Sequence, residues 1–117
     1  MLVYHRTHRA DAILREGFRD GYYQMPMIGL LRGVFVSALW PLDENEGADG
    51  DVVLSLDVPE PLFIEYEHVE EGKTYREAMI PAADLNRHVP TLRRLSEPEV
   101  DVLVLERWES FGPGLGQ

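Results

Sequence analysis

The stretch Gly33-Val34-Phe35-Val36-Ser37 decides the fold, because it predicts an apolar β-strand that ends in a polar residue. Two other stretches have the same character. Tyr4-His5-Arg6-Thr7 closes an apolar run near the start of the chain, and Tyr75-Arg76-Glu77-Ala78-Met79-Ile80-Pro81 carries a carboxylate inside another. An apolar strand does not need a His, a Ser and a Glu. We therefore expect these three polar residues to form one site assembled from separate strands.

The remaining pattern predicts a mainly antiparallel α+β fold. A first strand at residues 2–5 is followed by a helix over residues 8–16, which Thr7 can cap and Gly17 can end. Residues 18–32 show no clean period and are expected to form a loop. Further strands are expected at 52–58, 62–66, 75–80 and 100–105, with a short helical turn after Pro81.

These elements predict two small, mainly antiparallel sheets packed face to face with one main helix. The 117 residues suit one domain, which we place at residues 1–110, followed by a flexible tail at 111–117. No apolar run approaches the ~18 residues of a membrane span, and no secretory signal is visible. The absence of Cys excludes disulfides and thiolate zinc sites. A cytoplasmic protein without a membrane partner is the default expectation.

The charge of the chain is strongly acidic but uneven. Eleven basic and 21 acidic side chains give a net charge of −10, which disfavours a general nucleic-acid binder. Residues 1–33, however, hold five arginines against three acidic residues. This basic end also contains His5. It suits a small anionic ligand, although an ordinary solvated surface explains the same charges.

Three motifs in order resemble the ADP-ribosyltransferase fold. They are Tyr-His-x-Thr at residues 4–7, a helix ending Ile-Leu-Arg-Glu-Gly-Phe at 13–18, and Gly-Val-Phe-Val-Ser at 33–37. The chain is most similar to the branch with a His on the first strand, which includes poly(ADP-ribose) polymerases and diphtheria-type toxins. The tRNA 2′-phosphotransferases share that fold. The resemblance covers about residues 3–88 and implies a cleft between the two sheets that binds NAD as a consumed substrate.

The resemblance implies that His5 holds the ribose of the nicotinamide half of NAD, where a neutral imidazole can both donate and accept hydrogen bonds. Arg6 belongs to the same segment, and Thr7 would contact the ribose or adenosine side. Two structural interpretations stay open: His5 can be a core histidine bonded to the backbone, and Thr7 can be a helix cap. His5 and His8 lack an obvious third ligand nearby, so we expect no metal.

Ser37 and the tyrosine pair are further candidates. In the family, a Ser like Ser37 or a Tyr near it borders the nicotinamide pocket. Tyr22 and Tyr23 can stack on the nicotinamide ring, because each combines an apolar face with a polar tip. The alternatives are a strand-end serine for Ser37 and loop anchoring for the two tyrosines.

Glu77 is the expected catalytic residue, because the resemblance places the family's catalytic glutamate on a late strand. Breaking the bond between nicotinamide and ribose builds positive charge on the ribose. A fixed carboxylate can bond the ribose 2′-hydroxyl and stabilise that charge. The alternative is a structural glutamate that forms an ion pair with Arg76 or Lys73.

Several functions remain open from the sequence. The expected enzyme transfers ADP-ribose or hydrolyses NAD, and its acceptor can be a protein, a nucleic acid or a small molecule. Arginine is a poor candidate acceptor, because Tyr75 replaces the first glutamate of the Glu-x-Glu motif of arginine-modifying members. One alternative is an RNA 2′-phosphotransferase, which the acidic total disfavours. Others are an inactive binding module that keeps Glu77 salt-bridged away from the cleft, and an acidic protein that acts by its surface alone. The oligomeric state is not determined by the sequence.

Overall fold

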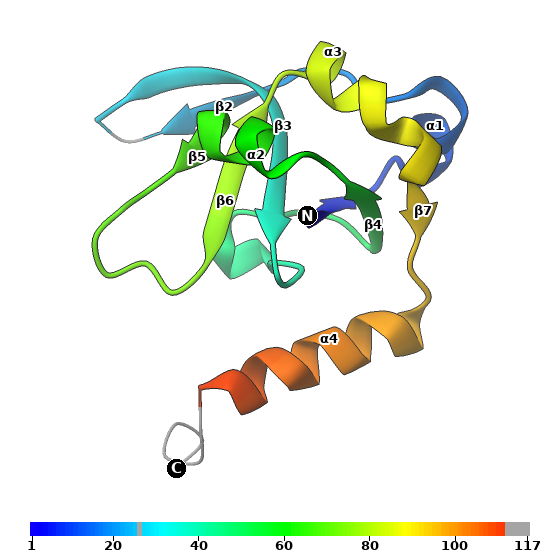
Figure 1. Cartoon of the computed structure of the whole chain (residues 1–117), viewed down its shortest axis with the longest axis vertical. Helices are drawn as coiled ribbons and strands as arrows, with labels where there is room; N and C mark the ends of the chain where they lie inside the picture. The colour runs from blue at the N-terminus through cyan, green and yellow to red at the C-terminus, as the bar shows by residue number, and fades with distance from the viewer. Residues whose placement is uncertain (26, 112–117) are drawn as a thin grey trace.

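The computed structural model describes residues 1–25 and 27–111, and its architecture is α+β (Figure 1). The elements in chain order are β1 Leu2–Thr7, α1 Ala10–Glu16, β2 Gly21–Met25, β3 Gly29–Ala38, η1 Glu44–Glu46, β4 Val52–Asp57, α2 Glu60–Tyr66, β5 Glu67–His68, β6 Arg76–Ile80, α3 Ala82–Leu85, η2 Asn86–Thr91, β7 Arg93–Arg94 and α4 Glu97–Ser110. The tail expected at residues 111–117 lies outside the described residues, except for Phe111, which follows α4.

The strands form one antiparallel sheet in the order β5-β6-β3-β1-β4-β7, with β2 paired to β3. The mainly antiparallel α+β fold is therefore confirmed, whereas the expected packing of two sheets face to face is not. The strands expected to carry the site are neighbours, since β3 lies between β1 and β6. This neighbourhood follows from long-range pairing and brings together segments about thirty to seventy residues apart in the chain.

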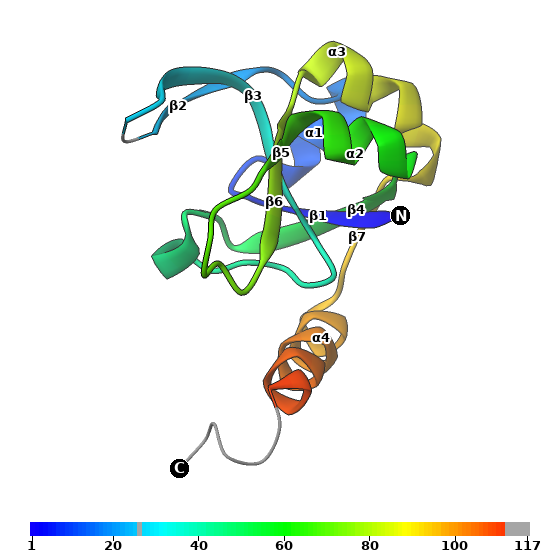
Figure 2. The ribbon, with the colours of Figure 1, turned by 60° about the vertical axis from the view of Figure 1, so that its left-hand side comes forward.

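Alternation along the strands divides the buried side chains between the two faces of the sheet. One face carries the main core, in which Val3, Val36 and Leu56 pack with Phe63 of α2 and Leu85 of α3. Helices α1, α2 and α3 lie on this side, and α4 lies on the other (Figure 2). Each fully buried leucine or phenylalanine contributes about 1.5–3 kcal/mol relative to exposure. The main core therefore fixes which face of β1 and β3 points toward the helices.

The second face is covered more thinly. Tyr4, Val53 and Leu95 form a small cluster there, against which Val100 and Leu103 of α4 pack. No described residue of α4 is itself buried. The helix begins at a capping box, in which Ser96 and Glu99 exchange side-chain and backbone hydrogen bonds. The capping box therefore stabilises α4 in addition to the contacts that the helix makes with the sheet.

Several expected elements are confirmed and three are wrong. The helix at 8–16, the strands at 52–58 and 75–80 and the turn after Pro81 correspond to α1, β4, β6 and α3. Residues 62–66 form a helix instead of a strand, because they belong to α2, which begins beside Pro59 and Pro61. Residues 100–105 lie in α4, the longest helix, and the expected loop at 18–32 contains β2 and the start of β3.

Candidate functional site

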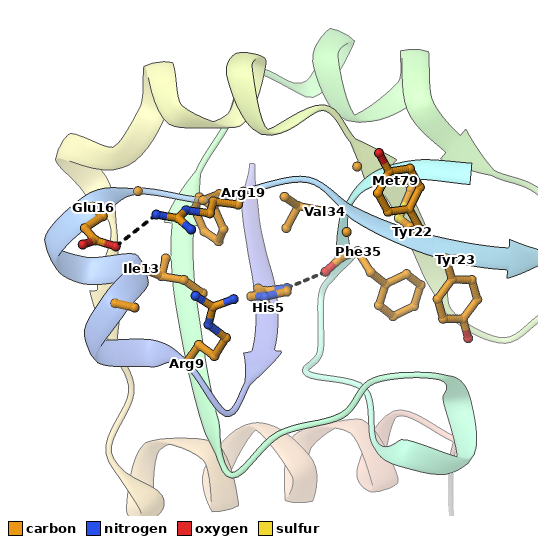
Figure 3. Close-up of a pocket in the computed structure, with 15 residues that line it drawn as sticks. His5, Arg9, Ile13, Glu16, Arg19, Tyr22, Tyr23, Val34, Phe35 and Met79 are labelled. Carbon is orange, nitrogen blue, oxygen red and sulfur yellow. Dashed lines mark hydrogen bonds and ion pairs between the residues drawn. The ribbon is translucent and has the colours of Figure 1, made fainter. Parts of the chain in front are cut away.

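A cavity of about 250 Å³ opens between β1, α1 and the β2–β3 hairpin (Figure 3). Its lining includes His5, Arg9, Arg19, Tyr22, Tyr23 and Phe35. The cavity exists because β1 and β3 pair only at Val3 and Tyr4. β1 continues to pair with β4 as far as Thr7, so it diverges from β3.

His5 lies where the two strands separate. Its Nδ1 is 2.7 Å from the carbonyl oxygen of Phe35, so the ring replaces the missing backbone pairing. Burial lowers the pKa of His5 below its ordinary value, against a smaller opposing effect of the Phe35 carbonyl. The imidazole is therefore neutral at pH 7. Because a carbonyl only accepts, Nδ1 carries the proton and donates it to Phe35, which leaves Nε2 as an acceptor. His5 can therefore accept a hydrogen bond from a ligand through Nε2, but it has no free N–H with which to donate one.

Aromatic rings form one side of the cavity. Tyr23 stacks on Phe35 with ring centroids 5.8 Å apart and planes 9° apart. The hydroxyl of Tyr23 lies against Gly47, so close that a Cβ added to this glycine would be 2.5 Å from the hydroxyl oxygen. Tyr22 is 68% exposed and stands at the mouth of the cavity. Tyr23 is therefore packed into the wall of the cavity, whereas Tyr22 is exposed and able to cover a ligand.

Arginines form the opposite side of the cavity, next to α1. Figure 3 shows the guanidinium group of Arg9 beside His5 and that of Arg19 turned toward Glu16. Nη2 of Arg19 lies 3.6 Å from Oε2 of Glu16. This ion pair is exposed and therefore contributes little to stability. Neither arginine was a candidate from the sequence, and their only signal was the basic character of residues 1–33.

Arg6 and Thr7 do not line this cavity. Arg6 alternates with His5 along β1 and donates from Nε to the carbonyl of Leu42 at 2.8 Å, so it holds a loop on the other face of the sheet. Thr7 is buried, and its hydroxyl accepts from the backbone N–H of Arg9 at 2.9 Å. Arg9 is the N-cap residue of α1, and no side chain caps that helix. The expected helix cap is therefore wrong in position, because Thr7 fixes the turn just before the helix.

Ser37 and Glu77 lie together, but outside the cavity. They are directly opposite each other in the β3–β6 pair, so they share a face of the sheet. Ser37 is buried and donates to the carbonyl of Trp40 at 2.7 Å, as a strand-end serine does. His5 alternates with Tyr4, the residue that pairs with Ser37, and so belongs to the other face. The three residues expected to line one cleft are thus split between the two faces.

Glu77 is 5% exposed and forms an ion pair with Lys73, which is the structural alternative left open by the sequence. Burial acts to lower the pKa of Lys73, but the hydrogen bond and the charge of Glu77 outweigh it and raise that pKa above its usual value. The Lys73 ammonium also lies 5.1 Å from the ring of Tyr75. Lys73 is therefore a fixed partner of the candidate catalytic carboxylate.

A small hollow of about 10 Å³ lies between Glu77 and the cavity. Glu77 and His68 line this hollow together with Tyr23, Phe35 and Met79. The last three also line the His5 cavity, so we call them the shared wall. His68 was not a candidate from the sequence, because nothing in a polar connection distinguishes it. On its other side, Glu77 lines a more open hollow of about 410 Å³ together with Lys73 and Tyr75. The structure therefore offers separate compartments around Glu77 and His5 in place of one cleft.

Comparisons of the chain with protein-family models, with curated proteins and with solved structures give no match. The resemblance to ADP-ribosyltransferases therefore stays a prediction. Among the described residues, no helix is long and apolar enough to cross a membrane.

Proposed function

We propose that the chain binds NAD with its nicotinamide end in the His5 cavity and breaks the nicotinamide–ribose bond, as an ADP-ribosyltransferase or an NAD glycohydrolase. The observation that carries the proposal is the order of groups in the cavity, with tyrosines on one side, His5 in the middle and arginines on the other. A planar ring stacks on tyrosine, and guanidinium groups bind phosphate oxygens. NAD presents a planar ring, a ribose and a pyrophosphate in the same order.

His5 would bind the ribose in this arrangement. Its Nδ1 is committed to Phe35, so Nε2 accepts a hydrogen bond from a ribose hydroxyl. The lowered pKa keeps the imidazole neutral and preserves this acceptor at pH 7. Arg9 and Arg19 would bind the pyrophosphate, and Tyr22 would cover the nicotinamide ring.

Glu77 would supply the negative charge for bond cleavage. As the bond to nicotinamide breaks, positive charge develops on the ribose, and a carboxylate near the 2′-hydroxyl stabilises it. Glu77 is on β6, which only β3 separates from β1. The shared wall of Tyr23, Phe35 and Met79 lies between the carboxylate and the cavity. The proposal therefore requires this wall to shift when NAD binds.

A binding module without catalysis is the second candidate. The Lys73–Glu77 ion pair favours it, because the carboxylate already has a buried partner and does not line the cavity. Such a module would bind NAD through the same His5 cavity. For both candidates we propose a cytoplasmic location, which the sequence leaves as the default.

Calorimetry with NAD and an assay of free nicotinamide separate these functions. The His5→Ala variant should bind NAD about 0.5–1.5 kcal/mol more weakly, since it loses the one hydrogen bond that Nε2 accepts. The Glu77→Gln variant should bind NAD normally and release nicotinamide roughly 100- to 1000-fold more slowly, the scale of a lost electrostatic contact in the transition state. Glu71→Gln, an exposed change in the same connection, is the control. Binding without nicotinamide release indicates the module, and no binding of NAD refutes both functions.

A further inference from the structure

The imidazole of His68 has a buried nitrogen with no partner in the chain. Among the side-chain nitrogen and oxygen atoms of residues 1–25 and 27–111, only Nε2 of His68 is both buried and without a hydrogen bond. Buried polar atoms are nearly always paired, and an exception calls for an explanation such as a bound water or a catalytic role. The chain therefore keeps a proton acceptor or donor available inside the protein.

The position of His68 connects this atom with the candidate catalytic carboxylate. His68 ends β5 and lies directly opposite Glu77 in the antiparallel pair with β6. Side chains of directly opposed residues stand on the same face of a sheet, with Cβ atoms about 4.5–5.5 Å apart. Both line the small hollow, and the shared wall separates that hollow from the His5 cavity.

Glu77 cannot supply both of the groups that bond cleavage needs. Its carboxylate is held by the Lys73 ammonium, and in the proposed function it stabilises the charge on the ribose. A nucleophile that attacks the ribose must also lose a proton, and a second group has to accept it. An imidazole with an unpaired ring nitrogen is suited to this task, because histidine is the side chain that most often serves as a general base in enzymes. Among the residues of the hollow, His68 is the histidine.

The size of the hollow matches a small molecule such as water. Its volume is about 10 Å³. A single water needs at least roughly 10–15 Å³, so the hollow is close to the size of one water. Water also gives the buried Nε2 a bonding partner. A water in the hollow would therefore lie beside both His68 and Glu77.

We propose that His68 is the general base that activates water for hydrolysis of NAD, an inference that rests on the proposed function. The water oxygen forms a bond to C1′ of the ribose as the bond from C1′ to the nicotinamide nitrogen breaks. The electron pair of the broken bond goes to nicotinamide. The proton of the water goes to Nε2 of His68 and then to solvent. The products are ADP-ribose, nicotinamide and one proton.

The test measures ADP-ribose formation from NAD by the full chain. His68→Gln should lower kcat by about 10²- to 10⁴-fold, the usual contribution of general acid–base catalysis. The KM for NAD should change by less than about threefold, because the lost interaction acts in the transition state. His88→Gln, on η2 and outside both hollows, should leave kcat unchanged.

A second variant separates catalysis from a structural role. His68→Ala should be slow alone and regain at least about tenfold in kcat when free imidazole is added, since the added base fills the vacated position. A structural histidine would lower the melting temperature and give no such rescue. Wild-type rates in His68→Gln, or loss without rescue in His68→Ala, overturn this inference alone. Nicotinamide release without free ADP-ribose indicates transfer and overturns this inference alone. If the wild type releases neither nicotinamide nor ADP-ribose while His5→Ala weakens NAD binding, the binding module is supported and this inference falls with the enzyme.

Discussion

Replacing Glu77 by Gln should destabilise the protein as well as slow any reaction. The side chains of Lys73 and Glu77 are only 9% and 7% exposed, so the variant leaves an ammonium buried without an opposing charge. Removing one partner of a fully buried pair costs about 3–5 kcal/mol. The glutamine oxygen still accepts a hydrogen bond from Lys73, so we expect a loss of about 2 kcal/mol in the free energy of unfolding.

This loss can be converted into a melting temperature. Unfolding entropy is about 2.1 cal/mol/K per residue, which for 117 residues gives about 0.25 kcal/mol/K. A loss of about 2 kcal/mol therefore lowers Tm by about 8 °C. Calorimetry or thermal circular dichroism measures this shift directly. The exposed control Glu71→Gln should change the free energy of unfolding by less than about 0.5 kcal/mol.

A double-mutant cycle completes the test. Lys73→Met alone leaves the carboxylate of Glu77 buried and unpaired, so it should also destabilise the protein. The double variant Lys73→Met/Glu77→Gln has neither buried charge and should lose about 1–2 kcal/mol less than the sum of the two single changes. A Tm for Glu77→Gln within about 2 °C of the wild type, or additive single changes, would refute the buried ion pair. Turnover of Glu77→Gln has to be measured well below its own Tm.

Two further predictions concern the buried ring of His5 and the close approach of Gly50 to the backbone of Thr7. Burial lowers the pKa of His5, so the unfolded chain takes up this proton first, and stability falls as pH drops below about 6.5. Between about pH 7.5 and about pH 5.5, the Tm of His5→Gln should therefore fall by less than the Tm of the wild type. An equal fall in both proteins would contradict the buried neutral ring. Gly50→Ala should destabilise by more than about 3 kcal/mol, because Gly50 has φ +150° and its new Cβ would lie 2.2 Å from the backbone nitrogen of Thr7. Gly29→Ala, at φ +105° with nothing within 4 Å, should lose only about 1–2 kcal/mol, and similar losses in both variants would disprove the close approach.

The elements that the sequence predicts well are those whose pattern is local. Residues 52–58 have one face more apolar than the other and end before Pro59, and β4 forms there. Gly17 was expected to end the first helix, and it follows α1 with φ +86°. In both cases the signal depends on neighbouring residues alone. Local chemistry was sufficient for these elements.

Two wrong strands have a common cause. Residues 62–66 and 100–105 are short runs rich in branched and aromatic side chains, and such runs do not distinguish a strand from a helix. The deciding signals were outside the runs. Pro61 stands in the first turn of α2, and Ser96 with Glu99 forms the capping box of α4. Giving these helix-start signals more weight than the apolar runs predicts both helices.

The arrangement of the site depended on register, which one sequence does not contain. The order β6-β3-β1 makes the strands of Glu77, Ser37 and His5 neighbours, as one site would require. Pairing Tyr4 with Ser37 then assigns His5 to the opposite face, since a shift of one residue exchanges the two faces of a strand. His68 became visible only through the pairing of β5 with β6.

A series of contacts from Tyr23 to α4 supports the wall between the His5 cavity and the small hollow. Tyr23 stacks on Phe35, and its hydroxyl abuts Gly47 at the end of η1. Glu46, the residue before Gly47, accepts from Nη1 of Arg107 in α4 at 2.7 Å. The shared wall is therefore supported by a loop that α4 holds with a largely buried ion pair. Because α4 has no buried residue of its own among those described, this support is easier to release than the core beneath His5. If NAD binding moves the shared wall, we expect the contact between Arg107 of α4 and Glu46 to change with it.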